Sequence, residues 1–306
     1  MKENQVSDTA IKTACWRAYH SHNDDPKIFN DFLAYDLVSE SEYESFETMY
    51  VSIFKTLAPP ELASSFSDDA AILKLMMQSL AAPALVLSRA RYAEDKLFDA
   101  LRQGVGQYVI LGAGMDTFAF RHPEVLEDLK VFEIDHPATQ EFKRRRLVEV
   151  GWVYPANLHL LPTDFAKGNI SEVLARSTYN KEGLSFFNWL GVTCYLPRDV
   201  VFTVLQTISG SAPAGSRIVF DYLDTDLLIP EKSAPRSQEI LMMAEQAGER
   251  IITFFNPETL AADLDEVGFR LEESLNPSEI NELYFSNRPD NYYACENAHL
   301  ACAVVK

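Results

Sequence analysis

The chain has 306 residues, 47% of them hydrophobic, and a formal net charge of -18 at pH 7. This length and apolar content suffice for one large domain with a substantial core. The excess of acidic residues repels phosphate backbones and anionic lipid, so we expect neither nucleic acid nor a membrane surface as a partner. A polar start, and no apolar run near the ~18 residues of a membrane span, predict a cytoplasmic protein. The four cysteines show no CxxC pair or metal-ligand spacing, which predicts reduced thiols and no metal site.

The first part of the chain, to about residue 105, has a helical pattern. Apolar residues recur at spacings of three and four, as at Leu73 and Met77, and Gly104 is suited to end a helix. The expected helices are residues 9–20, 27–38 and 69–103. We expect Pro83 to interrupt the last one, and residues 39–50 to continue the solvent face of a neighbouring helix.

From Gln107 onward, short apolar runs alternate with helical segments. The expected strands are residues 108–111, 130–134, 158–161, 185–190 and 217–222, a weaker one at 270–274, and a last one at 299–306. Pro137 and Gly151 are placed to open and close one of the intervening helices. This alternation predicts an α/β fold: a Rossmann-like, doubly wound, mostly parallel seven-stranded sheet with helices on both faces. Residues 1–84 would form a helical cap within the same domain, residues 85–306 the core, and an insertion at about 223–250 a lid.

A glycine turn follows the first expected strand. Gly112 and Gly114 have no Cβ, so the backbone can turn sharply there and approach a ligand closely. A dinucleotide fingerprint carries a third glycine shortly afterwards, whereas the chain continues with Met, Asp, Thr and Phe118. The turn therefore favours a nucleoside-bearing cofactor other than NAD or FAD, although such turns also occur where a chain merely reverses direction.

Acidic side chains follow the next two strands. Asp135 lies 21 residues beyond Gly114 at the end of a strand, where a carboxylate can accept hydrogen bonds from a ribose diol. Glu133, two residues earlier, should point to the same side, so either acid could hold the ribose. Asp164 could bind an exocyclic amine and Phe165 could stack on a base. The alternatives are solvated strand ends and, for Asp164, a helix cap.

Six segments then resemble one known family, the class I S-adenosylmethionine-dependent methyltransferases of the leucine carboxyl methyltransferase group. They are SRARYAEDKL at 88–97, QYVILGAGMDTFAFR at 107–121, VFEIDHP at 131–137, LLPTDF at 160–165, FFNWLGVTCYLP at 186–197 and IVFDY at 218–222. They occur in family order over most of the chain, and residues 9–20 are similar to the opening segment of the family. The resemblance implies S-adenosylmethionine as the cofactor.

The resemblance also implies roles for individual residues. Arg91 would pair with the methionine carboxylate, Gly112 would border the methionine portion, Asp135 would hold the ribose, and Asp164 and Phe165 would contact the adenine. An alternative for Arg91 is a helix-surface charge paired with Glu94 or Asp95.

The acceptor is expected to be a small molecule. Members that methylate a protein C-terminus carry a glutamate where this chain has Leu190, so the resemblance is closer to the bacterial members, many of which are implicated in small-molecule O-methylation. Asn188, Tyr195 and Tyr222 are candidate linings of the acceptor pocket.

Methyl transfer from a sulfonium is an in-line displacement that needs alignment and exclusion of water rather than a metal. A carboxylate acceptor needs no general base, whereas a hydroxyl would need one, for which His20, His22, His122 and Tyr222 are candidates. Two rival hypotheses are a catalytically silent protein that binds the same cofactor, and a nucleotide-dependent oxidoreductase.

Overall fold

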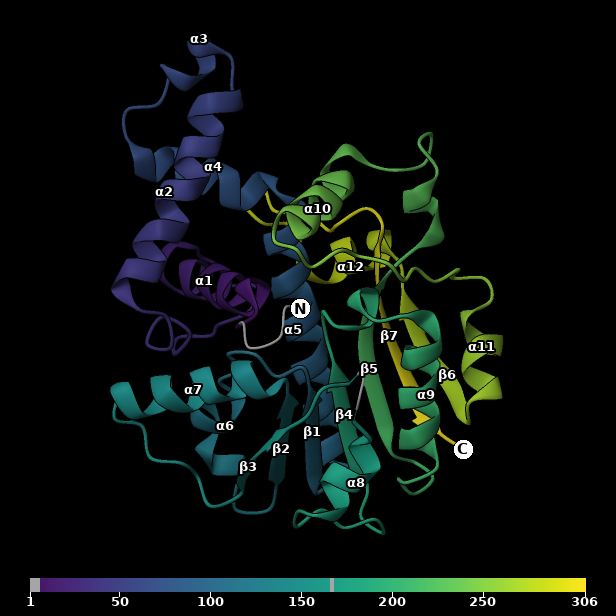
Figure 1. The fold of residues 1–306 in the computed structure, drawn as a ribbon. Coiled ribbons are helices and arrows are strands. Elements are labelled where there is room, and N and C mark those ends of the chain that lie inside the picture. The colour runs from purple at the N-terminus through teal and green to yellow at the C-terminus, as the bar shows by residue number, and fades with distance from the viewer. Residues whose placement is uncertain (1–5, 166–167) are drawn as a thin grey trace.

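A seven-stranded sheet in the order β3-β2-β1-β4-β5-β7-β6 forms the centre of the fold (Figure 1). The computed structural model describes residues 6–165 and 168–306. The strands are β1 (Gln107–Leu111), β2 (Lys130–Asp135), β3 (Leu158–Pro162), β4 (Ser185–Trp189), β5 (Arg217–Leu223), β6 (Phe269–Leu275) and β7 (Ala298–Val305). Strands β1 to β5 pair in parallel, and β7 runs antiparallel to both of its neighbours, β5 and β6. The mostly parallel α/β sheet expected from the sequence is thereby confirmed.

Helices cover both faces of the sheet, which explains why the central strands are apolar throughout. In β1, Tyr108 and Ile110 pack on one face with residues of α5 (Ala81–Leu101) and α12 (Pro277–Tyr284). Val109 and Leu111 pack on the other face with residues of α8 (Ile170–Ala175), α9 (Arg198–Ser209) and α11 (Leu260–Glu266). All five residues of β1 are buried, as two-sided coverage of a parallel strand requires. The remaining helices are α6 (Phe118–Arg121), α7 (Pro137–Glu149) and α10 (Pro235–Gln246).

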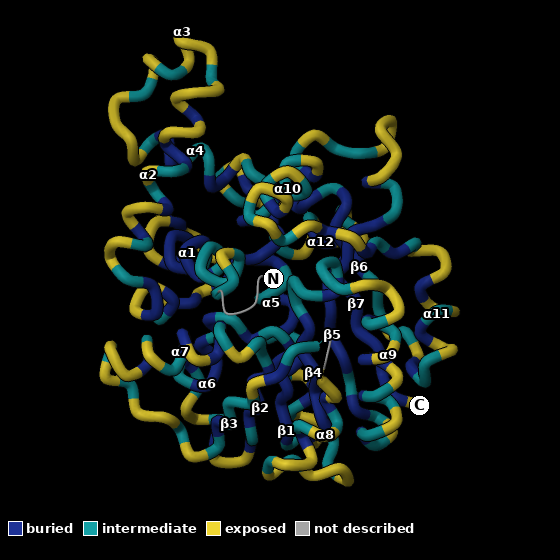
Figure 2. The backbone as a smooth tube through the Cα atoms, viewed as in Figure 1, coloured by how far each residue is buried: buried dark blue, intermediate teal, exposed yellow. Residues whose placement is uncertain are grey.

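The helices before α5 form a separate layer beside the carboxyl ends of the parallel strands (Figure 1). They are α1 (Asp8–Asn23), α2 (Glu40–Leu57), α3 (Pro60–Ala63) and α4 (Asp69–Ser79). Helix α2 starts with a capping box, in which Ser39 and Glu42 each accept a backbone N–H of the other. It buries Tyr43, Phe46 and Tyr50, so residues 39–50 are an independent helix with a core face, and the expectation of a mere solvent face was wrong. The α3 tip is largely exposed (Figure 2).

The expected helix at residues 27–38 is absent, because tertiary contacts take over its polar groups. The segment consists of turns. The backbone N–H of Ile28 donates to Nε2 of His20 at 2.7 Å, and Asp31 accepts hydrogen bonds from Arg17 and Thr117. These partners come from outside the segment, so helical periodicity alone could not reveal them.

The long helical stretch breaks at Leu80 rather than at Pro83. Pro83 lies in the first turn of α5, where the missing N–H would have had no helical partner. Within residues 6–165 and 168–306 no single helix is long and apolar enough to cross a membrane; α4 and α5 meet that test only as a pair bent by 63°.

Candidate functional site

A cavity of about 520 Å³ opens at the carboxyl ends of the parallel strands. The last residue of β2 and the residues that follow β1 and β3 line its wall; they are Asp135, Gly112, Gly114, Asp164 and Phe165. The carboxyl edge of such a sheet is where ligands of open α/β folds bind, and the volume suits a cofactor-sized molecule. The structure thus assembles these five sequence-predicted residues around one space.

The glycine turn depends on the missing side chains. Gly112 has φ of +75° and Gly114 has φ of +51°, values that L side chains rarely adopt. A Cβ on Gly112 would lie 2.3 Å from Cγ2 of Val192, so the turn packs directly against the segment that follows β4. The N–H of Gly114 donates to Oδ2 of Asp135 at 2.6 Å, which ties the turn to the end of β2.

Asp135 is the acid that faces the cavity. Besides the contact with Gly114, its Oδ1 accepts the N–H of His136 at 2.6 Å. Burial raises the pKa of Asp135, and these two backbone hydrogen bonds only partly offset that effect. A carboxylate has about four acceptor positions, so Asp135 retains capacity for a ligand hydroxyl.

Glu133 lies deeper and does not line the cavity. Its carboxylate forms a buried ion pair with Lys143 of α7, and the Lys143 ammonium also donates to the backbone carbonyl of Asp116 at 2.6 Å. Burial raises the pKa of Glu133 to about 7, although the Lys143 charge opposes this shift. Of the two acids, Asp135 therefore lines the cavity, whereas Glu133 is buried in its ion pair with Lys143.

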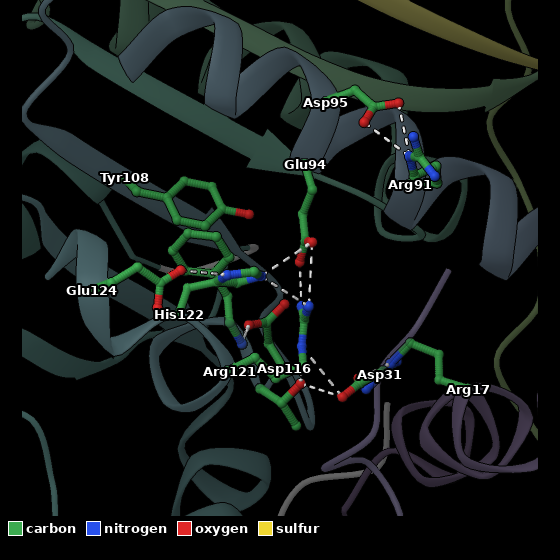
Figure 3. Close-up of polar contacts among 12 residues, drawn as sticks. Arg17, Asp31, Arg91, Glu94, Asp95, Tyr108, Asp116, Arg121, His122 and Glu124 are labelled. Carbon is green, nitrogen blue, oxygen red and sulfur yellow. Dashed lines mark hydrogen bonds and ion pairs between the residues drawn. The ribbon is translucent and has the colours of Figure 1, made fainter. Parts of the chain in front are cut away.

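Arg91 lies outside the cavity, contrary to the role that the resemblance implied. Its Nε donates to Oδ1 of Asp95 at 2.8 Å, with both side chains more than 40% exposed, and Figure 3 shows the pair apart from the other charges. The reason is helical geometry. The α5 residues that line the cavity are Val86, Arg89, Ala90, Ala93 and Glu94, a spacing of three and four that defines one helix face. Arg91 lies about 200° around the helix from Arg89 and so points away.

Arg89 is a cavity residue that the sequence reasoning missed. Its Nη1 donates to Oδ2 of Asp221 at 2.8 Å, and Oδ1 of Asp221 accepts the N–H of Gly191 at 2.5 Å. Gly191 has φ of +66°, and a Cβ there would overlap the Arg89 guanidinium. Ala90 and Ala93 lie on the same helix face as Arg89 and also line the cavity. This face of small residues is the sequence signal that could have identified Arg89.

A cluster of charged side chains, which Figure 3 shows, contributes Arg17, Asp31, Glu94 and Arg121 to the cavity lining. Glu94 pairs with Arg121, whose Nε also donates a hydrogen bond to Thr117 Oγ1 at 2.9 Å. Burial disfavours the Glu94 charge, but hydrogen bonds from His122 and Arg121 hold its pKa below the usual value. Opposite them, Arg17 of α1 donates through Nε to Asp31 at 2.8 Å.

Arg17 also reaches across the fold, because its Nη2 donates to the carbonyl of Met115 at 2.7 Å. These two contacts leave part of its five N–H donors for a ligand. The sequence reasoning did not identify Arg17, since nothing in the local pattern of α1 shows a contact with a turn 98 residues away.

The three predicted acceptor-pocket residues separate in the structure. Asn188 lines the cavity; its Nδ2 donates to the Tyr108 hydroxyl at 2.8 Å, while its buried Oδ1 has no donor among the described residues. Tyr195 also lines the cavity. Tyr222 lines a smaller, adjoining cavity instead, while its ring stacks on His299 and its hydroxyl shares a hydrogen bond with Ser274. Leu190 contributes an apolar wall.

The candidate bases lie away from the cavity. His20 is fully buried between Asp24 and the N–H of Ile28, and His22 bonds the carbonyl of Ala18. His122 pairs with Glu94 but does not line the cavity. In the part of the chain that the structure describes, no group of three or more His, Cys, Asp or Glu side chains could hold a metal ion.

Comparison with known proteins agrees with this architecture. The model of the family described as leucine carboxyl methyltransferase matches residues 10–209. A Bacillus subtilis (strain 168) protein named "Putative S-adenosyl-L-methionine-dependent methyltransferase YktD" is 38% identical over 310 residues, covering 100% of both chains.

Solved structures share the fold. A "duf574 family protein" from Streptomyces avermitilis aligns with a TM-score of 0.59 at 10% identity, covering 96% of this chain and 97% of that one. A "putative methyltransferase" from Thermobifida fusca aligns with a TM-score of 0.54 at 17% identity, covering 79% and 89%. The family match and the full-length relative confirm the resemblance seen in the sequence motifs, and the chain belongs to the leucine carboxyl methyltransferase family.

Proposed function

We propose that this methyltransferase transfers a methyl group to a carboxylate or hydroxyl oxygen of a small molecule. Its cofactor is S-adenosylmethionine, as for the relative from Bacillus subtilis. The observation that carries the proposal is the single cavity that connects Asp135 and Asp164 at one end with Asn188 and Tyr195 at the other, along the glycine turn. Such a space can hold an elongated cofactor and still present its reactive group to a second molecule.

The residues present fit this cofactor. Asp135 and Asp164 offer carboxylate acceptors for a ribose and an exocyclic amine, and Phe165 offers a ring beside them. Oδ1 of Asn188 is buried without a donor among the described residues, which is costly unless a ligand supplies one. An ammonium group is a suitable donor for it.

Arg17 takes the role that Arg91 does not fill. It lines the cavity, carries unused donors, and lies near the turn through its bond to Met115. Arg121 is engaged by Glu94 and Thr117 instead. We therefore propose that Arg17 binds the carboxylate of the cofactor. Glu94 and Asn188 would then lie beside the ammonium group of the cofactor.

When bound, S-adenosylmethionine supplies a methyl group on a positively charged sulfur, a leaving group that needs no metal. The chain contributes position and shielding, through the turn that Asp135 holds and through the apolar side chains of Leu190 and Tyr195. The histidines at positions 20, 22 and 122 do not line the cavity, whereas His136 does, beside Asp135 and with its Nδ1 accepting the N–H of Ala138. This arrangement supports an acceptor that is already ionised, a carboxylate, over a hydroxyl that needs a base.

The test uses a methyl-labelled cofactor and a cytosolic extract, because the chain is predicted to act in the cytoplasm. We expect labelled small molecules, and release of the label by mild base would identify methyl esters. Label found on nitrogen, on carbon or in protein would contradict the proposal. Binding of S-adenosylmethionine without formation of S-adenosylhomocysteine across fractions would favour the silent binder.

A further inference from the structure

A second, smaller cavity of about 70 Å³ adjoins the first and is called the side chamber here. Its walls come from α1, α5, α10 and the end of β5, and they include Trp16, Leu85, Leu223, Ile240, Met243 and Ile251. The residues that line both cavities, and so form the junction between them, are Thr9, Thr13, Val86, Arg89, Gly191 and Tyr195. The side chamber lies beyond the cofactor cavity at the side opposite to Asp135 and Asp164, which line only the larger space.

The side chamber is mostly apolar at its walls, where Lys12 and Asp221 are the charged residues, and it is charged at the junction through Arg89. Of the described residues that line both cavities, Arg89 carries the positive charge, and only 13% of its side chain is exposed. Asp221 fixes one edge of the guanidinium, and the missing side chain of Gly191 lets that group lie over the backbone. The remaining donors of Arg89 are free to bind an anionic group, for which a planar guanidinium is well suited.

Resting on the proposed function, we propose that the acceptor is a small monocarboxylic acid with a short apolar tail. Arg89 holds one carboxylate oxygen at the junction, and the side chamber holds the tail. A cavity of ~150 Å³ admits benzene, so a chamber of about 70 Å³ selects a smaller tail. Met243 lies on α10 at the chamber wall, and its flexible side chain determines the tail length that fits.

The chemical step balances without a further reactant. The free carboxylate oxygen forms the new O–C bond while the C–S bond breaks, and the electron pair of that bond goes to sulfur. The anionic acid and the cationic sulfonium become a neutral methyl ester and a neutral thioether, and no proton leaves. This fits a junction that offers a guanidinium and no free base, since Asp221 is engaged by Arg89 and Gly191.

The first experiment measures binding of straight-chain monocarboxylic acids to the complex with S-adenosylhomocysteine, by calorimetry, against alcohols and amides of the same length. We expect the acids to bind and the alcohols and amides to bind at least tenfold more weakly. Arg89→Gln should weaken acid binding about tenfold or more, because a charge-assisted hydrogen bond is lost, and should change the dissociation constant of S-adenosylhomocysteine less than threefold. Arg91→Gln, two residues along the same helix, is the matched control and should change neither constant.

Equal loss of acid and S-adenosylhomocysteine binding in Arg89→Gln would make Arg89 a cofactor ligand and overturn the proposal. So would equal affinity for acids and alcohols. These outcomes differ from failure of the proposed function, which would show as no binding of S-adenosylmethionine or no O-methyl product from any small molecule.

The second experiment does not depend on Arg89. Met243→Ala enlarges the side chamber and should shift the best-bound acid to a longer chain, whereas Met243→Phe should shift it to a shorter one. Met242, its exposed neighbour on α10, provides the control Met242→Ala, for which no shift is expected. An unchanged length preference in both Met243 variants would show that the tail lies elsewhere.

Discussion

Arg89 and Arg91 lie two residues apart on α5, yet Arg89 lines the cofactor cavity and Arg91 pairs with Asp95 at the surface. The helix turns ~100° per residue, so two positions place the side chains on nearly opposite sides. The two arginines therefore have different expected effects on the binding of the proposed acid, which Arg89→Gln should weaken and Arg91→Gln should not, although the motif SRAR presents them together.

Arg91→Ala should leave the affinity for S-adenosylmethionine within about twofold, since a surface ion pair contributes little. Arg17→Ala should lower that affinity about tenfold or more, because a charge-assisted hydrogen bond to the carboxylate is lost. Calorimetric titration of both variants checks the assignment. A large loss in Arg91→Ala combined with none in Arg17→Ala would restore the role that the family resemblance implied.

Asp135→Asn should weaken S-adenosylmethionine binding about tenfold to a hundredfold, because a carboxylate accepts stronger hydrogen bonds than an amide. The free energy of unfolding should also fall, since the N–H groups of Gly114 and His136 lose their charged acceptor. Titration and urea unfolding measure the two effects. Asp95→Asn, outside the cavity, is the control, and equal affinities of the two variants would refute the ribose role of Asp135.

Gly112→Ala should reduce stability and cofactor binding more than Gly151→Ala does. The two glycines have similar φ, +75° and +72°, so a side chain costs each about 1–2 kcal/mol of backbone strain. At Gly151 a Cβ meets nothing within 4 Å, whereas at Gly112 it meets Val192. This overlap should add about 1–3 kcal/mol to the loss in free energy of unfolding. Equal losses in urea unfolding would mean that Val192 moves aside without cost.

His122→Asn should destabilise the protein most at acidic pH. A hydrogen bond with Glu94 raises the pKa of His122 above 6.5, although burial opposes the shift. The protonated imidazole is therefore favoured in the folded state, and its stabilisation is fully present below pH 6.5 and is lost as the pH rises through the folded pKa. The difference in unfolding free energy between wild type and variant should shrink as the pH rises from 5.5 to about 8.

His159 provides the opposite case. Burial lowers its pKa, with a smaller contribution from Lys130, so the folded state favours the neutral ring and loses stability as the pH falls below 6.5. Relative to wild type, His159→Asn should therefore become less destabilised as the pH falls. Parallel trends for the two variants would show that pH acts through other groups.

The strands after Gln107 could be predicted because their signal is local. Buried on both faces, they read as short apolar runs, and glycine or proline marks their ends. Residues 27–38 have an equally clear helical pattern but form turns. Their polar groups bind His20, Arg17 and Thr117, and the stability of those contacts exceeds the weak intrinsic preference for a helix.

By itself, the sequence determined the α/β sheet, the glycine turn, the position of Asp135 at the end of the following strand, and the protein family. These features depend on backbone conformation and on the order of segments along the chain, both of which leave local patterns. Only the tertiary structure decided which arginine faces the cavity, which of the acids Glu133 and Asp135 is covered, and that a side chamber adjoins the cofactor. Those outcomes depend on the direction of side chains around a helix and on contacts between distant segments, such as Arg17 with Met115, which no local pattern encodes.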